Sequence, residues 1–314
     1  MAKTGKFKLD KRYLIVGLLL LIGLYIILPQ FGDFKTSLNK LSDPNLYWTA
    51  IAIIFTFLTY LSASLTYYFL AFKKLSLALT MLAQVAVMFI NRLLPGGVGA
   101  LGANYLYLKN QKHTSAQAAT VVAINNFLGF LGHNLLFWGL VLFTSYSAIS
   151  SSDDGSNKSE SILLLILVLS LVGLAAAFIF GKQKILKELN DIKKQIFDYR
   201  HRPFNLVKAL ISTITLTIFN VMCLYACAQA LGVELNFAIT FLIFTFGLTA
   251  GTLTPTPGGL GGFEAGLVAG FMAYDINSST ALAVALLYRL ISYWLPLIIG
   301  AGTFIIAQKI KLFG

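Results

Sequence analysis

Long apolar runs divide this chain and leave almost no room for a water-soluble surface. Several of them reach the roughly 20 residues that an α-helix needs to cross a bilayer. Of the 314 residues, 57% are hydrophobic and only 11% are charged. Lipid-exposed backbone must satisfy its own hydrogen bonds, so such runs are expected to be helices. The sequence predicts an all-α polytopic membrane protein with apolar runs at residues 13–28, 47–72, 76–93, 98–108, 115–146, 161–180, 204–232, 237–254, 260–274 and 279–307.

Nearly the same helix-breaking motif occurs twice. Residues Leu94–Gly99 read LPGGVG, and residues Thr256–Gly261 read TPGGLG. Aligning Pro95 with Pro257 places similar apolar helices after each motif, and a shift of one further residue puts Asn126 on Arg289. A broken helix in a membrane protein exposes backbone groups that can hold a polar ligand.

Loop charges predict the side of the membrane for each segment. The basic N-terminus and the basic segment 181–203 are expected in the cytoplasm, and the mixed loop 147–160 outside. With a cytoplasmic C-terminus, parity requires residues 76–114 to begin and end inside and residues 235–278 to begin and end outside. Each of these two segments is therefore predicted to be a hairpin with Pro-Gly-Gly at its tip.

These assignments predict an inverted-topology repeat within one membrane domain, 1–314. Repeat 1 covers about 13–146 and repeat 2 about 161–307, with 181–203 as a cytoplasmic linker. Each half reads span, span, broken hairpin, span, and such repeats place a substrate site near the bilayer midplane. Hairpin arms of roughly 15–18 residues either re-enter halfway or nearly cross, and both options satisfy the parity.

Charge and cysteine content narrow the function classes. The net charge of +12 lies in short loops beside apolar helices, where orientation and contact with anionic lipid explain it better than nucleic-acid binding. Cys223 and Cys227 are expected to be buried small hydrophobic residues, and two thiols alone make a poor metal site. No metal, cofactor or catalytic motif is predicted, so an enzyme is not expected. The first run, 13–28, is interpreted as an uncleaved span.

Three ionisable side chains within the apolar segments are the main candidates for function, because charge in a bilayer is costly unless it faces protein, water or a counter-ion. Arg289 either forms a structural ion pair or holds a phosphate through parallel hydrogen bonds. Glu264 caps a helix, pairs with Arg289 or contacts a cationic headgroup such as an aminoacyl ammonium. Arg92 faces Arg289 near the midplane if its hairpin re-enters, and otherwise extends to the outer interface.

The two loops, Pro95–Gly97 and Pro257–Gly259 with Gly261, complete this set. Their backbone N–H groups could bind an anion at the following helix N-terminus, or their glycines could serve close helix packing. Tyr288 beside Arg289, and Asn126 as the counterpart of Arg289, are also candidate substrate contacts.

Other polar and aromatic residues are expected to have structural roles. His133 is predicted to be hydrogen-bonded in the packing, with a pathway role as the alternative. His113 is a loop residue with no neighbouring group that indicates chemistry. Tyr293 and Trp294 are expected to be interface anchors or packing residues.

The second motif also carries a family resemblance. TPTPGGLGGFE (Thr254–Glu264), followed by ALLYRLISYWLP (Ala285–Pro296), resembles the lysylphosphatidylglycerol synthase transmembrane family, the flippase-like membrane domain of multiple peptide resistance factors. The likeness covers essentially the whole chain. It implies movement of aminoacylated phosphatidylglycerol between leaflets, with a C-terminal motif formed by Pro257, Gly258, Gly259, Gly261, Glu264 and Arg289.

This sequence departs from the family pattern in two respects. The soluble aminoacyl-transferase domain of full-length members is missing from the sequence, so lipid synthesis is not expected. Many members carry a Glu after the first glycines and an Arg in the next helix, where this chain has Gly102 or Asn104 and Asn125–Asn126. The headgroup therefore stays open.

The leading hypothesis is a lipid flippase or scramblase in the cell membrane. An anionic or aminoacylated phospholipid headgroup would sit in a polar cavity between the repeats, held by Arg289 and Arg92 with Glu264 nearby. One alternative is a carrier of polyprenyl-phosphate or its sugar conjugates. Another is a non-transporting scaffold that assists a separate lipid-modifying enzyme or glycosyltransferase.

Overall fold

The computed structural model describes residues 39–41, 43–94, 97–150, 197–254 and 256–313. Within these residues the regular structure is helical and contains no β-strand, as predicted. The predicted runs at 13–28 and 161–180 lie outside the described residues. The elements are α3 (Leu46–Leu70), α4 (Leu77–Leu93), α5 (Val98–Asn110), α6 (Ser115–Ser150), the 3-10 turn η2 (Tyr199–His201), α9 (Pro203–Ala230), α10 (Phe237–Leu253), α11 (Gly262–Met272), α12 (Ser278–Arg289), the π-helical turn η3 (Leu290–Trp294) and α13 (Leu295–Lys309).

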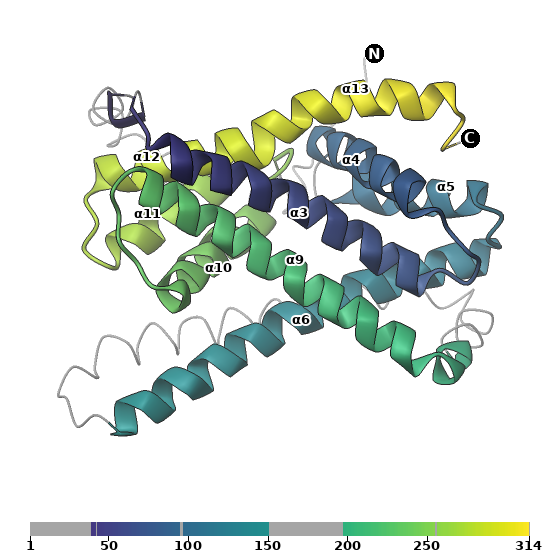
Figure 1. Cartoon of the computed structure of the whole chain (residues 1–314), viewed down its shortest axis with the longest axis horizontal. Helices are drawn as coiled ribbons and strands as arrows, with labels where there is room; N and C mark the ends of the chain where they lie inside the picture. The colour runs from purple at the N-terminus through teal and green to yellow at the C-terminus, as the bar shows by residue number, and fades with distance from the viewer. Residues whose placement is uncertain (1–38, 42, 95–96, 151–196, 255, 314) are drawn as a thin grey trace, which may run out of the picture.

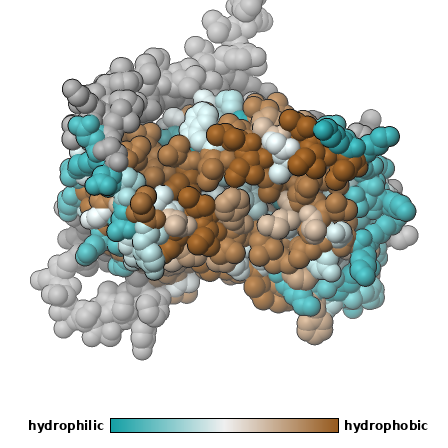
Figure 2. Space-filling view, turned by 45° about the horizontal axis from the view of Figure 1, so that its top comes forward, coloured by the Kyte–Doolittle hydropathy of each residue, from teal (hydrophilic) through white to brown (hydrophobic). Residues whose placement is uncertain are grey.

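Four of the described helical segments are long and apolar enough to cross a membrane. They are α3, the Ser115–Leu142 part of α6, α9, and the rod Ser278–Lys309 formed by α12, η3 and α13. The surface agrees with this assignment: a broad hydrophobic face runs across the middle, and hydrophilic residues gather at both ends (Figure 2). Together these features confirm an all-α polytopic membrane protein.

Both Pro-Gly-Gly motifs interrupt helices as predicted. The first break lies between α4 and α5, and the second lies between α10 and α11. The α4–α5 hairpin lies towards one end of the long axis and the α10–α11 hairpin towards the other, while α3 and α9 pack side by side through the centre (Figure 1). The α13 end of the last rod packs on α4. The inverted repeat and the sides of the termini stay predictions.

Glycines allow α10 and α11 to pack closely. A Cβ atom placed on Gly266 would lie 2.7 Å from the Phe246 carbonyl oxygen and 2.9 Å from the Gly247 Cα atom. Because these neighbours are backbone atoms, a side chain at position 266 would force the two helices apart. Small residues at such interfaces let helix backbones approach in membranes.

Buried polar side chains also join the two helices of the first hairpin, α4 and α5. The Gln84 amide donates to Asn104 Oδ1 at 2.8 Å, and the Thr80 and Tyr107 hydroxyls lie 2.8 Å apart. All four side chains are buried, so their partners remove the cost of placing polar groups inside the protein.

A buried histidine ties two loops together at the far end of this hairpin. His113 Nε2 accepts a hydrogen bond from the Lys73 backbone N–H at 3.2 Å. Its Nδ1 lies 3.1 Å from the Leu108 carbonyl oxygen and 3.2 Å from the Gln111 carbonyl oxygen. These partners require a neutral ring with the proton on Nδ1, so His113 is a structural link that the sequence did not reveal.

The glycine packing predicts that Gly266→Ala destabilises the protein, because overpacking a tight contact typically costs about 1–3 kcal/mol. Gly102→Ala is the matched control, since a Cβ there has no neighbour within 4 Å. That control should be neutral or stabilising, because alanine favours helix over glycine by about 1 kcal/mol. Thermal unfolding in detergent measures both variants, and equal unfolding temperatures would contradict the packing account.

The hydrogen bonds of His113 predict that the stability of the protein depends on pH. Burial lowers the pKa of His113 below its usual value. Because the unfolded chain takes up the proton below about pH 6.5 and the folded chain resists it, stability should fall as the pH drops from 7 towards 5. His113→Gln should remove this part of the pH dependence, whereas His201→Gln, at an exposed position, should retain it. Unfolding temperatures measured across this range test the difference.

Candidate functional site

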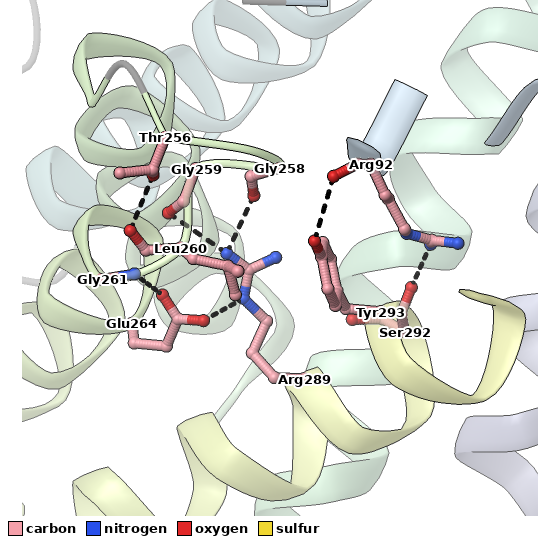
Figure 3. Close-up of polar contacts among 10 residues, drawn as sticks. All are labelled: Arg92, Thr256, Gly258, Gly259, Leu260, Gly261, Glu264, Arg289, Ser292 and Tyr293. Carbon is pink, nitrogen blue, oxygen red and sulfur yellow. Dashed lines mark hydrogen bonds and ion pairs between the residues drawn. The ribbon is translucent and has the colours of Figure 1, made fainter. Parts of the chain in front are cut away.

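The first part of the site is a buried ion pair between α12 and α11. Arg289 is the last residue of α12 and is 7% exposed. Its Nε donates to Glu264 Oε1 at 2.6 Å, and its Nη2 donates to the Gly258 and Gly259 carbonyl oxygens at 3.1 and 3.3 Å (Figure 3). One guanidinium group therefore holds the second Pro-Gly-Gly loop against the last rod.

Glycine is required for the shape of this loop. Gly258 and Gly259 have φ values of +62° and +66°, in the left-handed region that glycine adopts without steric cost. A Cβ atom on Gly258 would also lie 2.3 Å from the Tyr293 ring. After the turn, the Gly261 N–H donates to Glu264 Oε2 at 2.8 Å, which caps α11. Glu264 thus makes both the cap and the ion pair.

Aromatic rings cover the guanidinium group of Arg289. Its Cζ lies 4.3 Å from the Phe263 ring centroid and 5.1 Å from the Tyr293 ring centroid. Tyr288 is buried and stacks on Phe263 with centroids 5.7 Å apart. These contacts add cation–π attraction and restrict access of water to the pair.

The second part of the site is Arg92, in the last turn of α4. Its Nη2 donates to the Ser292 carbonyl oxygen at 2.6 Å and to the Tyr60 hydroxyl at 3.3 Å. Its Nη1 is buried and has no hydrogen-bond partner among the described residues. Arg92 is therefore only partly satisfied, and no carboxylate in the described structure pairs with it.

A proline explains why Ser292 can accept this bond. In a regular α-helix, the N–H of residue 296 would donate to the carbonyl of residue 292, but Pro296 has no N–H. The backbone before it forms the π-helical turn η3. The freed carbonyl faces α4 and accepts from Arg92 (Figure 3).

Tyr293 joins the two parts. Its ring centroid is 5.1 Å from Arg92 Cζ and 5.1 Å from Arg289 Cζ, and its hydroxyl donates to the Arg92 carbonyl oxygen at 3.4 Å. Figure 3 shows the ring between the two arginines. The ends of both broken hairpins thus meet at one side chain of the last rod. Sequence reasoning assigned Tyr293 only to anchoring or packing, although the nearby Pro296 was a signal of irregular backbone.

The structure brings most of the second-motif residues together. The residues in direct contact around the loop are Gly258, Gly259, Gly261, Glu264 and Arg289. Pro257 begins the turn, because its carbonyl oxygen accepts from the Leu260 N–H at 3.4 Å. Tyr288 supports Phe263 from behind, so its place is in the packing beneath the pair.

The candidate residues from the first half of the sequence make fewer contacts with this site. Gly97 is the N-cap of α5, with φ +73°, while Pro95 and Gly96 lie outside the described residues. Asn126 is exposed on α6, and its amide donates to the Val122 carbonyl oxygen of the same helix at 2.7 Å. Its hydrogen bond therefore does not link it to the Arg289–Glu264 pair.

The chemistry of the site is that of guanidinium groups. In the described part of the chain, no three His, Cys, Asp or Glu side chains lie close enough to share a metal ion. The site instead offers two cations and a tyrosine hydroxyl, and carbonyl groups released by helix breaks accept hydrogen bonds from the cations. Guanidinium groups recognise oxyanions through charge-assisted hydrogen bonds.

Comparisons with known proteins agree with this architecture. UPF0104 membrane protein MJ1595 of Methanocaldococcus jannaschii is 27% identical over 41% of this chain and 39% of its own length. UPF0104 membrane protein PH1989 of Pyrococcus horikoshii is 26% identical over 38% of this chain and 36% of its own length. The match therefore covers less than half of the length of each of these two relatives. UPF0104 membrane protein MJ1078 of M. jannaschii is 27% identical over 71% of this chain and 95% of its own length.

The family pattern described as the lysylphosphatidylglycerol synthase TM region matches residues 14–300, which is most of the sequence. The C-terminal motif that carries the resemblance lies within this match and forms the loop and ion pair of the site. The chain belongs to the lysylphosphatidylglycerol synthase transmembrane family.

Proposed function

We propose that this protein moves an anionic or aminoacylated phospholipid between the leaflets of the cell membrane, as a flippase or scramblase. Family membership supports a lipid-related role in the membrane. The observation that carries the proposal is Arg92, whose buried Nη1 has no partner in the described structure. A buried guanidinium nitrogen without an acceptor is costly, and a lipid phosphate oxygen would supply that acceptor.

Helix lengths support a position for Arg92 deep in the bilayer. The α4 arm that carries Arg92 has 17 residues and so does α10, while α5 has 13 and α11 has 11. At about 1.5 Å per residue the longer arms extend about 26 Å and the shorter arms about 20 and 16 Å, all less than a hydrocarbon core about 30 Å thick. Each hairpin is therefore best explained as re-entrant, with its tip inside the membrane. Entry from opposite faces, as the loop charges predict, would bring both tips to the midplane region.

The two arginines have different roles in this proposal. The charge of Arg289 is neutralised by Glu264, and its Nη2 donates hydrogen bonds to two loop carbonyl oxygens, so Arg289 positions the second loop. Arg92 has only neutral partners, Ser292 and Tyr60, and retains its positive charge. The sequence placed Arg289 first as the headgroup anchor, and the geometry favours Arg92. The Arg289 pair would then hold Tyr293 in place for the adjacent headgroup.

The contacts at Tyr293 indicate how access would alternate. Arg92 binds the last rod through the Ser292 carbonyl, and Tyr293 binds α4 through the Arg92 carbonyl. A phosphate that attracts the Arg92 guanidinium would compete with the Ser292 carbonyl and loosen this joint. The tips could then separate toward one face at a time, while the acyl chains stay in lipid.

A transport assay tests the role of Arg92. In proteoliposomes, Arg92→Ala should slow the transbilayer movement of labelled phosphatidylglycerol about tenfold or more, the loss expected for a charge-assisted hydrogen bond of about 1.5–3 kcal/mol. Arg92→Lys should retain part of the rate. Arg200→Ala, at an exposed position with a ring contact to Phe197, is the matched control and should behave as wild type.

Normal rates for a folded Arg92→Ala variant would contradict the proposal. Adding a competing lipid to the same assay distinguishes the phospholipid transporter from the two alternative functions. Excess polyprenyl-phosphate that abolishes phosphatidylglycerol movement would favour the polyprenyl carrier, and the absence of any lipid movement by wild type would favour the scaffold.

The positioning role of Arg289 makes a separate prediction about stability. Arg289→Ala or Glu264→Ala should each lower the free energy of unfolding by about 3–5 kcal/mol, because each leaves an uncompensated charge buried. Replacing both, as Arg289→Met with Glu264→Leu, should recover much of this loss. Denaturant unfolding in detergent measures the series. If Arg289→Ala kept full stability and lost transport, Arg289 would be the direct headgroup contact instead.

A further inference from the structure

A second basic site lies near the end of α3, away from Tyr293. The end of α3, the α3–α4 loop and the start of α9 line an open pocket of about 320 Å³. We call it the basic pocket, and its charged lining residues are Lys73, Lys74, Arg202 and Lys208. Tyr60, which contacts Arg92, and Phe69, which lines the basic pocket, are nine positions apart on α3. At about 1.5 Å per residue this separation is about 13 Å, so the two sites are distinct.

The positive charges of the basic pocket have no acidic partner among its lining residues. The N-terminus of α9 lies at the same place, because Arg202 is its N-cap, and the first turn of α9 carries no acidic residue. A helix N-terminus is itself partly positive and disfavours neighbouring cations. Four cations and this helix end together favour a bound anion.

Neutral groups hold two of the cations in place. Arg202 Nη1 donates to the Phe72 carbonyl oxygen at 3.4 Å, and its Cζ lies 5.8 Å from the Phe72 ring centroid. Lys208 Nζ lies 5.7 Å from the Phe69 ring centroid. These partners position the cations without neutralising them, so the charge stays available for a ligand.

Apolar side chains beside the cations indicate that the anion belongs to a lipid. Phe204 and Val207, in the first turns of α9, are 79% and 53% exposed. They do not line the pocket themselves, but they lie on the same end of α9 as Arg202 and Lys208, and α9 is long and apolar enough to cross a membrane. An acyl chain could run along this exposed apolar surface. The loop charges predict that this end is cytoplasmic, and the cytoplasmic leaflet is the one rich in anionic lipids. We propose that the basic pocket binds the phosphate of an anionic phospholipid from the adjacent leaflet.

Binding to the full-length protein in detergent tests this inference. Wild type is titrated with dioctanoyl phosphatidylglycerol, dioctanoyl phosphatidylcholine or inorganic phosphate, and half-saturation is read from the thermal unfolding shift. Lys74→Gln with Lys208→Gln should weaken phosphatidylglycerol binding at least tenfold, because each cation near the headgroup contributes about a fivefold effect. Lys109→Gln with Lys309→Gln, two exposed lysines outside the basic pocket, is the matched control and should bind as wild type.

An Arg92→Ala background separates this site from the one at Tyr293. The pocket-dependent part of the binding should persist there, even if Arg92 proves irrelevant to transport. Equal affinity in the pocket variant and wild type would overturn the inference. So would equal affinity for phosphatidylcholine, or an effect of inorganic phosphate as large as that of the lipid. If the double variant does not fold, Lys74→Gln alone should give about a fivefold loss by the same measurement.

Discussion

Guanidinium groups inside a membrane protein need acceptors, and here backbone carbonyls released by broken helices supply them beside the Glu264 carboxylate and the Tyr60 hydroxyl. The Pro-Gly-Gly loop turns the Gly258 and Gly259 carbonyls toward Arg289. Pro296 leaves the Ser292 carbonyl without a helical donor, and Arg92 takes it. Regular helices would bond these carbonyls internally. The irregular backbone and the buried arginines therefore depend on each other.

This dependence explains why distant segments converge. One break follows the end of α4, where Arg92 lies in the last turn, and the other precedes α11 and its Glu264. The last rod contributes Arg289 and Tyr293 (Figure 3). Tyr293 contacts both guanidinium groups, so the ends of the two hairpins meet at one ring. The two hairpins are held differently: Glu264 of α11 pairs with Arg289, whereas the neutral Gln84 and Asn104 amides join α4 to α5. In the described structure Arg92 has no carboxylate partner, and its Nη1 has no acceptor.

Helix positions could be predicted well from sequence because hydrophobic runs and helix breakers act locally. The ends of α4, α9 and α10 fall within two residues of the predicted runs, and both breaks occur at the Pro-Gly-Gly motifs. The pairing of Glu264 with Arg289 was one of the expected alternatives, since two charges in apolar surroundings have few other partners. The opposite orientation of the two halves in the membrane was inferred from loop charges alone, and it stays a prediction.

The parts that sequence reasoning missed depend on three-dimensional contacts between distant segments. The role of Tyr293 requires α4 to lie against the last rod, and no local pattern encodes that contact. The link from His113 to the Lys73 N–H likewise joins two loops 40 positions apart. The basic pocket combines a loop after α3 with the start of α9, so its lysines and arginines looked like ordinary interface charges. Asn126 was aligned with Arg289 by repeat position, but its own helix carbonyl satisfies its amide.

An experimental structure of the protein with bound phosphatidylglycerol would test the headgroup-binding role of Arg92 most directly. We expect phosphate density within hydrogen-bond distance of the Arg92 guanidinium, next to Tyr293, with the Arg289–Glu264 pair intact. Density that displaces Glu264 from Arg289, or hairpin tips that do not meet at Tyr293, would contradict it.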